Sequence, residues 1–189
     1  MKKIRLIILL TASAVLLVAC GFTSLRLQQA VSGSGVLGRD ERPVSGIERV
    51  KMSGFGELII SQGEAESLTI EGDDNLLSNF ITQTSAGTLS IHERPFFSFQ
   101  PKQKLIFHLT VKDLKALELS DFARVTVKDL YTEGLRISLS GFSELSFENL
   151  QTSELSGTIN GFSRLAVNGQ VAKERVETRE NATIQTAGK

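Results

Sequence analysis

The residues that could carry catalysis are few and scattered along the chain. The 189 residues include one Cys, one Tyr, two His and no Trp. His92 and His108 stand apart from each other and from Cys20, which is not the ligand spacing of a zinc site. The sequence contains no Gly-Xaa-Ser-Xaa-Gly elbow and no phosphate-binding Walker loop. We therefore expect no catalytic residues, no metal and no cofactor.

Carboxylates gather at one point, the stretch EGDDN from Glu71 to Asn75. Such oxygen ligands suit Ca²⁺, but the regular ligand spacing of a calcium loop is missing. The preferred interpretation is a solvated turn whose Asp73 and Asp74 precede a short helix over residues 73–81. Whether these two carboxylates bind a cation stays open from the sequence.

A second acidic group would matter only if the protein were an enzyme. Its members are Asp113, Asp121, Lys128 and Asp129. At intervals of about twenty residues, however, Asp121 is replaced by Gly141 and Gly161, so no carboxylate pair is kept. A carbohydrate-active enzyme of the β-helix type therefore remains only the alternative to a non-enzymatic function.

The N-terminus has the composition of a lipoprotein signal peptide over residues 1–19. MKKIR is followed by a short apolar stretch and by LVAC, in which Ala19 precedes Cys20. This pattern predicts cleavage before Cys20 and lipidation of its thiol, with the membrane as a partner. Gly21 follows Cys20 where an Asp would signal retention in the inner membrane. The predicted location is the cell envelope, at the outer membrane if the source has two membranes.

Residues 20–43 show no sustained period and predict a tether, whose last part could pack on the domain that begins at 44 and continues to 189. The domain itself shows short runs in which apolar residues recur every second position, which is the period of β-strands. We therefore predict an all-β protein. The formal net charge of zero gives no indication of nucleic-acid binding.

The β-strand pattern repeats at an interval of about twenty residues. SDFARVTV, SGFSELSF and NGFSRLAV begin at residues 120, 140 and 160, and SGFGELII begins at 53. A fixed short period of this kind is typical of a β-solenoid, a β-helix-like fold whose coils would here have about twenty residues. A final copy, residues 176–186, fits if one residue is lost, with Asn181 in the Phe position and a polar composition suited to an end cap.

Stacked coils place residue n over residue n+20. The side chains that share a column therefore contact one another and must be compatible in size and charge. Arg124, Glu144 and Arg164 alternate in charge, as stacking requires. Each repeat also carries a Phe directly after a small residue or Asp. These Phe residues could form an exposed aromatic strip for a ligand, but the preferred interpretation is a ladder that fills the inside of a corner. The four residues of this structural repeat are Phe55, Phe122, Phe142 and Phe162.

The stretch from His92 to Lys104 interrupts the repeat with two Pro and a cluster of three Phe. We expect a loop between the two halves of the domain. Its Phe96, Phe97 and Phe99 either form an apolar contact surface or fold back to cap the core. This loop is the preferred candidate for an interaction site.

The segment SGFGELIISQG…SLTIEGDDNLL, followed by the SGF repeats behind a lipobox, resembles the "putative auto-transporter adhesin head GIN-domain" family. The resemblance covers residues 44–186. It implies a right-handed β-solenoid-like fold and a lipid-anchored, non-enzymatic adhesion, binding or scaffold role. It supplies no catalytic residues. The expected partners are the membrane, a protein or glycan ligand at the cell surface and a second copy of the chain in a homo-oligomer.

Overall fold

The computed structural model describes residues 30–187, and the chain there is all-β, as the alternating pattern predicts. The predicted signal peptide and Cys20 lie outside the described residues. Within the described part, no helix is long and apolar enough to cross a membrane. The strands are β1 (Val31–Ser32), β2 (Leu37–Arg42), β3 (Arg49–Gln62), β4 (Ser67–Asp73), β5 (Phe80–Ser85), β6 (Thr88–Glu93), β7 (Phe99–Gln100), β8 (Ile106–Val111), β9 (Ala116–Leu139), β10 (Glu144–Ile159), β11 (Arg164–Val171), β12 (Glu174–Thr178) and β13 (Thr183–Ala187).

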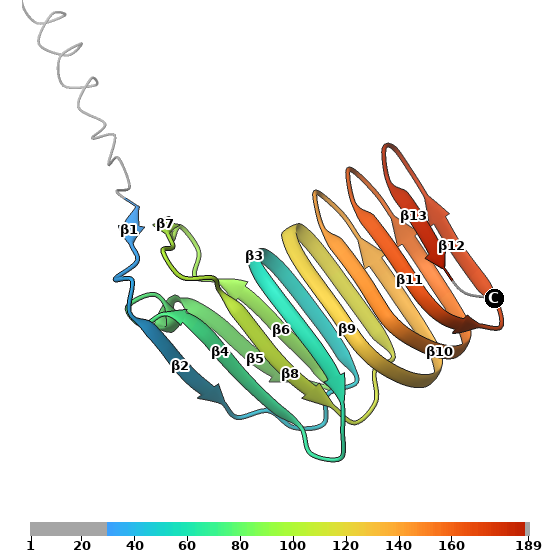
Figure 1. Ribbon diagram of the computed structural model, residues 1–189, viewed down its shortest axis with the longest axis horizontal. Helices are drawn as coiled ribbons and strands as arrows, with labels where there is room; N and C mark the ends of the chain where they lie inside the picture. Colours follow the sequence, from blue (N-terminus) through green and yellow to red (C-terminus); the bar gives the residue numbers. More distant parts are fainter. Residues whose placement is uncertain (1–29, 188–189) are drawn as a thin grey trace, which may run out of the picture.

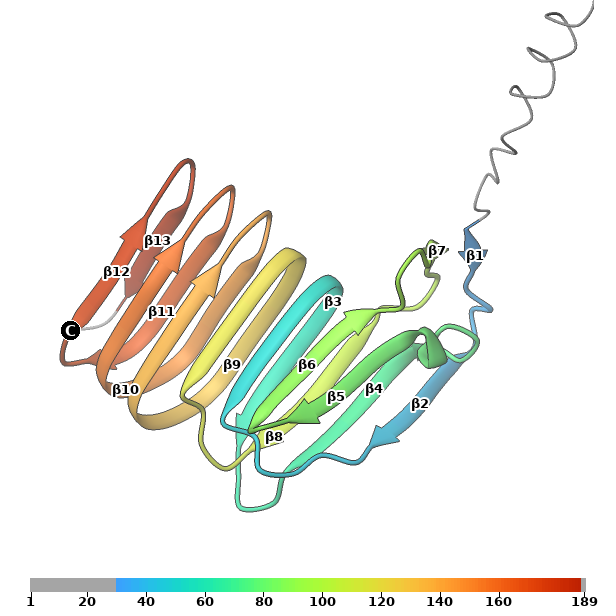
Figure 2. The same ribbon diagram turned by 180° about the vertical axis from the view of Figure 1, so that it is seen from behind.

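The second half of the chain is built from parallel pairs with a constant offset. Val125 of β9 pairs with Leu145 of β10, and Leu145 pairs with Leu165 of β11. The interval of twenty residues read from the sequence is therefore the register of the sheet. Figures 1 and 2 show the ribbon winding through β9, β10 and β11 in successive turns along the long axis of the molecule. At Leu150 the offset falls by one residue, because an irregularity after Phe147 lets Leu150 pair with Gly169.

The first half of the chain enters the same stack but adds antiparallel strands. Val50 and Leu58 of β3 pair in parallel with Leu117 and Val125 of β9, so the early copy of the repeat is in register with the later ones. In the intervening chain, β6 and β8 also pair in parallel with β3 and so continue the stack. The antiparallel pairs are those of β4 with β2 and β8, and of β5 with β6.

Two predicted boundaries need correction. The predicted tether, residues 20–43, contains β1 and β2, and β2 pairs with β4 over its whole length, so residues 37–42 belong to the folded sheet. The expected helix over residues 73–81 is only a 3-10 turn, Leu77–Asn79. Phe80 already begins β5, because its side chain is buried in the core beside the Phe107 ring.

The inside of the stack is filled by aliphatic columns, and the repeated Phe residues lie outside it. Val125, Leu145 and Leu165 are each at most 1% exposed, whereas Phe142 is 55% exposed. The predicted internal Phe ladder is therefore wrong. The other three repeat residues, Phe55, Phe122 and Phe162, are also exposed.

The reason is the alternation of side chains along a strand. Leu119, Ala123 and Val125 of β9 are buried, while Asp121 at the corner is exposed. Phe122 directly precedes the buried Ala123 and therefore points to the opposite side of the strand. The inner position after each Phe is small, and Ala123, Ser143 and Ser163 are buried there. The buried positions before and after the corner therefore remain an even number of residues apart.

The residue before each Phe has a left-handed backbone conformation in every turn. The φ angle is +62° at Asp121, +74° at Gly141, +72° at Gly161 and +61° at Glu180. The N–H of the next residue donates to the turn below, from Phe142 to the Asp121 carbonyl at 2.7 Å and from Phe162 to the Gly141 carbonyl at 2.8 Å. The N–H of Asn181 does the same to Gly161 at 3.1 Å, which confirms Asn181 in the Phe position.

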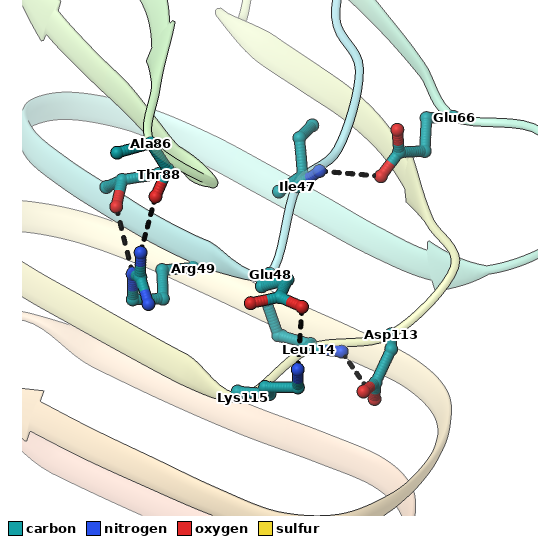
Figure 3. A network of polar contacts seen from close by, with 9 residues as sticks. All are labelled: Ile47, Glu48, Arg49, Glu66, Ala86, Thr88, Asp113, Leu114 and Lys115. Atoms are coloured by element: carbon teal, nitrogen blue, oxygen red, sulfur yellow. Dashed lines mark hydrogen bonds and ion pairs between the residues drawn. The ribbon is translucent and has the colours of Figure 1, made fainter.

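Polar contacts fix the corner where β3, β6 and β9 begin (Figure 3). The Glu66 carboxylate accepts the N–H of Ile47 at 2.8 Å, and Lys115 Nζ lies 2.6 Å from Glu48 Oε1. The hydrogen bond and charge of Glu48 raise the pKa of the Lys115 ammonium. Arg49 Nε donates to Thr88 Oγ1 at 3.0 Å. These contacts join residues 47–49 to three other segments of the sequence.

Asp73 is not in a solvated turn, which corrects the preferred interpretation of EGDDN. Its side chain is buried, and its two carboxylate oxygens accept the N–H groups of Gly35 at 2.7 Å, Lys102 at 2.8 Å and Gln103 at 2.9 Å. Burial raises the pKa of Asp73, but these backbone hydrogen bonds and the Lys102 charge outweigh burial and lower it overall. The carboxylate thus ties the chain before β2 and the chain before β8 to the end of β4.

A first prediction concerns Gly157, which stacks against Ile137 at a φ of +149°. A Cβ there would overlap the Ile137 carbonyl oxygen, so Gly157→Ala should lower the free energy of unfolding by at least about 3 kcal/mol. At Gly134 the nearest atom to an added Cβ is 3.9 Å away, and Gly134→Ala should change stability by less than about 1 kcal/mol. Urea denaturation of both variants measures the difference, and equal midpoints would contradict the stacked register.

A second prediction concerns the Asp73 carboxylate. Because its folded pKa lies below the ordinary value of 3.8, its stabilising effect is present above that pH and is lost as the pH falls through the folded pKa. Asp73→Asn should therefore unfold at lower urea than wild type at pH 7, and the gap should narrow near pH 3. Glu64→Gln, in the exposed turn after β3, serves as the control. A gap that is independent of pH would show that the Asp73 charge is not the stabilising feature.

Candidate functional site

The repeated Phe side chains form a ridge of stacked rings on the surface. The ring centroids of Phe122 and Phe142 are 5.4 Å apart, those of Phe142 and Phe162 are 5.2 Å apart, and both pairs are within 6° of parallel. All three rings are more than half exposed. We call Phe122, Phe142 and Phe162 the Phe ridge. Its geometry follows from the parallel register, which places equivalent side chains one above another.

The Phe-rich loop before β8 meets the column of the Phe ridge at Phe55. The Phe99 ring contacts Phe55 edge to face at 6.0 Å and the buried Phe80 at 5.4 Å. Phe97 stacks on Phe99 at 5.2 Å, and both are partly buried against the core. Phe96 instead is 87% exposed. Phe97 and Phe99 thus cover the core while Phe96 faces solvent. The Phe residues of the loop and the Phe column of the repeat, which are far apart in the sequence, therefore lie beside each other.

Two grooves flank the column formed by Phe55 and the Phe ridge. One has a volume of about 510 Å³ and lies between this column and the loop, and its lining includes Phe97, Phe99 and Pro101. The other has a volume of about 440 Å³ and is lined by Phe55, Phe122 and Phe142 together with charged residues. The charged residues of the second groove are Glu57, Lys104, Arg124 and Glu144. An apolar ridge between two partly polar grooves is a surface suited to binding.

The charged column beside the ridge alternates as the sequence predicts. Arg124 Nε donates to Glu144 Oε2 at 2.8 Å, and Arg164 Nη1 lies 3.8 Å from Glu144 Oε1. The hydrogen bond and charge of Glu144 raise the pKa of the Arg124 guanidinium. These exposed pairs contribute little to stability. Their effect is to fix the charges along one wall of the groove.

The residues that could have formed an active site do not converge within residues 30–187. Asp113 accepts the N–H of its neighbour Leu114 at 2.8 Å, and Asp129 accepts the Asn149 amide at 2.9 Å. His108 Nε2 lies 3.6 Å from a Glu71 carboxylate oxygen, while His92 contacts the Glu93 carbonyl. No group of three His, Cys, Asp or Glu side chains in the described part could hold a metal ion. Each of these side chains has a separate local partner.

Sequence reasoning identified the ridge residues but placed them inside. The signal that places them correctly is the alternation of inward and outward side chains along each strand. Counting every second residue from Leu119 reaches Ala123 and Val125, so the same count leaves Phe122 outside. The small residues after each Phe, Ser143 and Ser163 among them, were the second indication, because an inner corner has little room.

Comparisons with known proteins agree on the fold. A structure described as a putative lipid binding protein, from Parabacteroides distasonis ATCC 8503, is 14% identical with a TM-score of 0.51, over 84% of this chain and 100% of that one. A putative adhesin from Bacteroides fragilis NCTC 9343 is 11% identical with a TM-score of 0.50, over the same shares. No curated protein matches the sequence.

The family comparison covers most of the chain. A single family model, described as "Putative auto-transporter adhesin, head GIN domain", matches residues 47–188. The match includes the Phe ridge, both grooves and the Phe-rich loop. The resemblance noted in the SGF repeats is therefore confirmed, and the chain belongs to this family of head GIN domains.

Proposed function

We propose that the protein is a lipid-anchored, non-enzymatic adhesion or binding protein of the cell envelope, and that the Phe ridge is its contact surface. The observation that carries the proposal is the exposure of three stacked Phe rings, in a column that has a groove on each side at Phe55 and Phe122. Contiguous apolar surface of this kind is characteristic of interaction sites. Membership of an adhesin-like family supports the same function.

The architecture suits a rigid surface. We infer that the stacked turns form a right-handed β-solenoid-like domain, as the family resemblance implies. The parallel register that joins β9, β10 and β11 supports this inference. In such a domain each turn contacts only its neighbours, and the outer columns present the same group at regular intervals. A ligand with repeated apolar groups would gain several weak contacts at once.

The arrangement of the rings favours a polypeptide ligand over a glycan. Phe142 has a ring on each of its faces, so a sugar cannot lie flat against it. Ring edges and the flanking grooves remain accessible, and these can pack against apolar side chains of an extended segment. The charges of Arg124 and Glu144 along one groove would orient that segment.

The alternative, a carbohydrate-active enzyme, has no observation in its favour among residues 30–187. Its candidate groups at Asp113, Asp121 and Asp129 have separate partners or exposed positions. The proposed role therefore needs no turnover and no cofactor.

Anchoring is proposed from the sequence alone. Cys20 follows a basic and apolar leader, and Gly21 follows Cys20, which favours the outer membrane in a bacterium with two membranes. The membrane would then be reached through the lipid, and the domain would face the periplasm or the exterior.

The ridge can be tested with the full chain on the surface of a bacterial host. Phe122→Ser, Phe142→Ser and Phe162→Ser combined should weaken binding to immobilised extracellular-matrix proteins at least about tenfold. Because the rings are largely exposed, unfolding stability should fall by only about 1–3 kcal/mol, the contribution of the two stacked pairs. Tyr131→Ser, another exposed aromatic on β9, is the matched control.

The possible results separate the candidates. Unchanged binding by the triple variant would exclude the ridge as the contact surface. Saturable binding to a glycan array, lost in the same variant, would replace the polypeptide ligand by a glycan. Release of cleaved sugar from polysaccharide substrates would overturn the non-enzymatic function.

Anchoring can be tested with Cys20→Ala, which removes the chain's only thiol. We expect wild type to incorporate radiolabelled palmitate and to sediment with membranes. The variant should lose the label, because no acceptor thiol remains for the lipid. Cys20→Ala protein that still carries the label would show that Cys20 is not the lipidated residue.

A further inference from the structure

The stack ends at β12 and β13, whose outer edges have no neighbouring strand among the described residues. β12 pairs with β10 and β13 pairs with β11, each on one side only. Most side chains of both strands are exposed, and Val176 and Ile184 are only partly buried against the core. An edge of this kind presents N–H and C=O groups that another strand can pair with.

The hydrogen bonds show which backbone groups face that edge. The Lys173 carbonyl accepts from Leu155 N at 2.9 Å, and Arg179 N donates to the Ile159 carbonyl at 2.9 Å. In a parallel pair the backbone N–H and C=O groups of every second residue point toward the neighbouring strand. Those of Arg175 and Glu177 therefore also point toward β10. The N–H and C=O groups of Glu174, Val176 and Thr178 therefore point outward. On β13 the N–H of Thr183 donates to the Ser163 carbonyl. The backbone N–H and C=O groups of Ile184 and Thr186 therefore face outward.

We propose that these edges bind a second copy of the chain, end to end and antiparallel, about one two-fold axis. On β12 the axis passes through Val176. Val176 then faces Val176 of the second copy in a hydrogen-bonded pair, and Glu174 faces Thr178 of the second copy in the next. The partner needed is this chain itself, because an isologous interface requires a self-complementary edge.

The side chains of β12 have that self-complementarity. With Val176 on the axis, Arg175 lies opposite Glu177 of the second copy, and Glu177 lies opposite Arg175. Within one chain Arg175 also pairs with Glu154 and Glu177 with Arg179, each at 3.4 Å, so the contacts across the axis would add to or replace these exposed ion pairs. Opposite charges in directly facing positions stabilise an antiparallel pair. On the inner side, Val176 would cover Val176, and the Thr178 hydroxyl could donate to the Glu174 carboxylate. Charges often protect an edge from pairing. Within β12 their order attracts a two-fold partner, whereas Lys173, just before the strand, faces Arg179 of the second copy, a like charge.

The second edge strand is consistent with the same axis. Val176 and Gln185 are equally distant in sequence from the turn between Glu180 and Asn181, so they lie across the last turn of chain from each other. An axis through Val176 therefore also passes near Gln185. Gln185 then faces its own copy in a non-hydrogen-bonded pair, and the outward Ile184 faces Thr186 of the second copy. Both strands can pair without a change of register.

The dimer would place the ends that carry β1 far apart, since β1 and β13 lie at opposite ends of the molecule (Figure 1). The interface would not cover the Phe ridge, whose column is replaced at the last turn by Asn181. Failure of the dimer would therefore leave the proposed ligand surface untouched, and failure of ligand binding would leave the dimer untouched.

The charge pair gives the first test, on the full chain extracted in mild detergent. Sedimentation should give the mass of a dimer for wild type. R175E alone and E177R alone should each weaken dimerisation at least about tenfold, because each places like charges opposite each other. The double variant R175E/E177R restores the alternation and should restore the dimer. Circular dichroism of each variant checks that the fold is retained.

Cysteine cross-linking tests the register. Paired residues on the axis at position 185 would have Cα atoms about 4.5 Å apart, within reach of a disulfide. Q185C should therefore form a cross-linked dimer under mild oxidation. A187C alone should not, because its two copies would be about 14 Å apart. A187C mixed with T183C should cross-link, since these positions face each other.

A wild-type chain that stays monomeric at about 100 μM would overturn the proposal. So would a dimer that R175E and E177R leave unchanged, because the edge charges would then have no part in it. Cross-links in A187C alone but not in Q185C would exclude the two-fold axis through Val176 and Gln185.

Discussion

The fold depends on one constraint, which is that each residue of a turn lies directly over an equivalent residue about 4.8 Å away. Every column must therefore be compatible with its own repetition. Inside, Val125, Leu145 and Leu165 satisfy this by aliphatic contact. At the corner, Ser143 Oγ donates to Ser163 Oγ at 3.2 Å in a fully buried position. Outside, rings stack on rings and Glu144 lies between two arginines.

The same constraint explains why the molecule carries an apolar surface. A left-handed residue, such as Gly141, turns the chain without breaking the alternation of side chains, so the next residue must point outward. A Phe in that position cannot be buried by its own turn. It gains contact only from the Phe above and below, which covers ring faces and leaves ring edges exposed. The repeat thus produces a ridge that is stabilised within the stack and still accessible from outside.

The sequence predicted what the repeat controls and failed where contacts are not repeated. The all-β class, the register of twenty residues, the Arg124–Glu144–Arg164 column and the place of Asn181 follow from local patterns and are confirmed. The buried role of Asp73 could not be predicted, because its partners Gly35 and Lys102 are far away in sequence. The hydrophobic character of the Phe column predicts an inside position, whereas its place one residue before a buried small residue predicts the outside position that the structure has.

A repeating stack has no internal reason to stop, because each turn exposes the same edge that it has just covered. At one end the chain stops the repeat with antiparallel strands, β2 and β4, whose ends are tied together by the Asp73 carboxylate. At the other end the last turn keeps the register and changes the side chains. There the inner columns change from Ile159 to Thr178 and from Val167 to Thr186. The polar inner residues lower the cost of exposing the last turn to water, while the backbone edge keeps its capacity to pair. The two ends thus solve the same problem differently, with antiparallel β2 as the edge strand at one end and β12 and β13, with their polar inner residues, as the edge strands at the other.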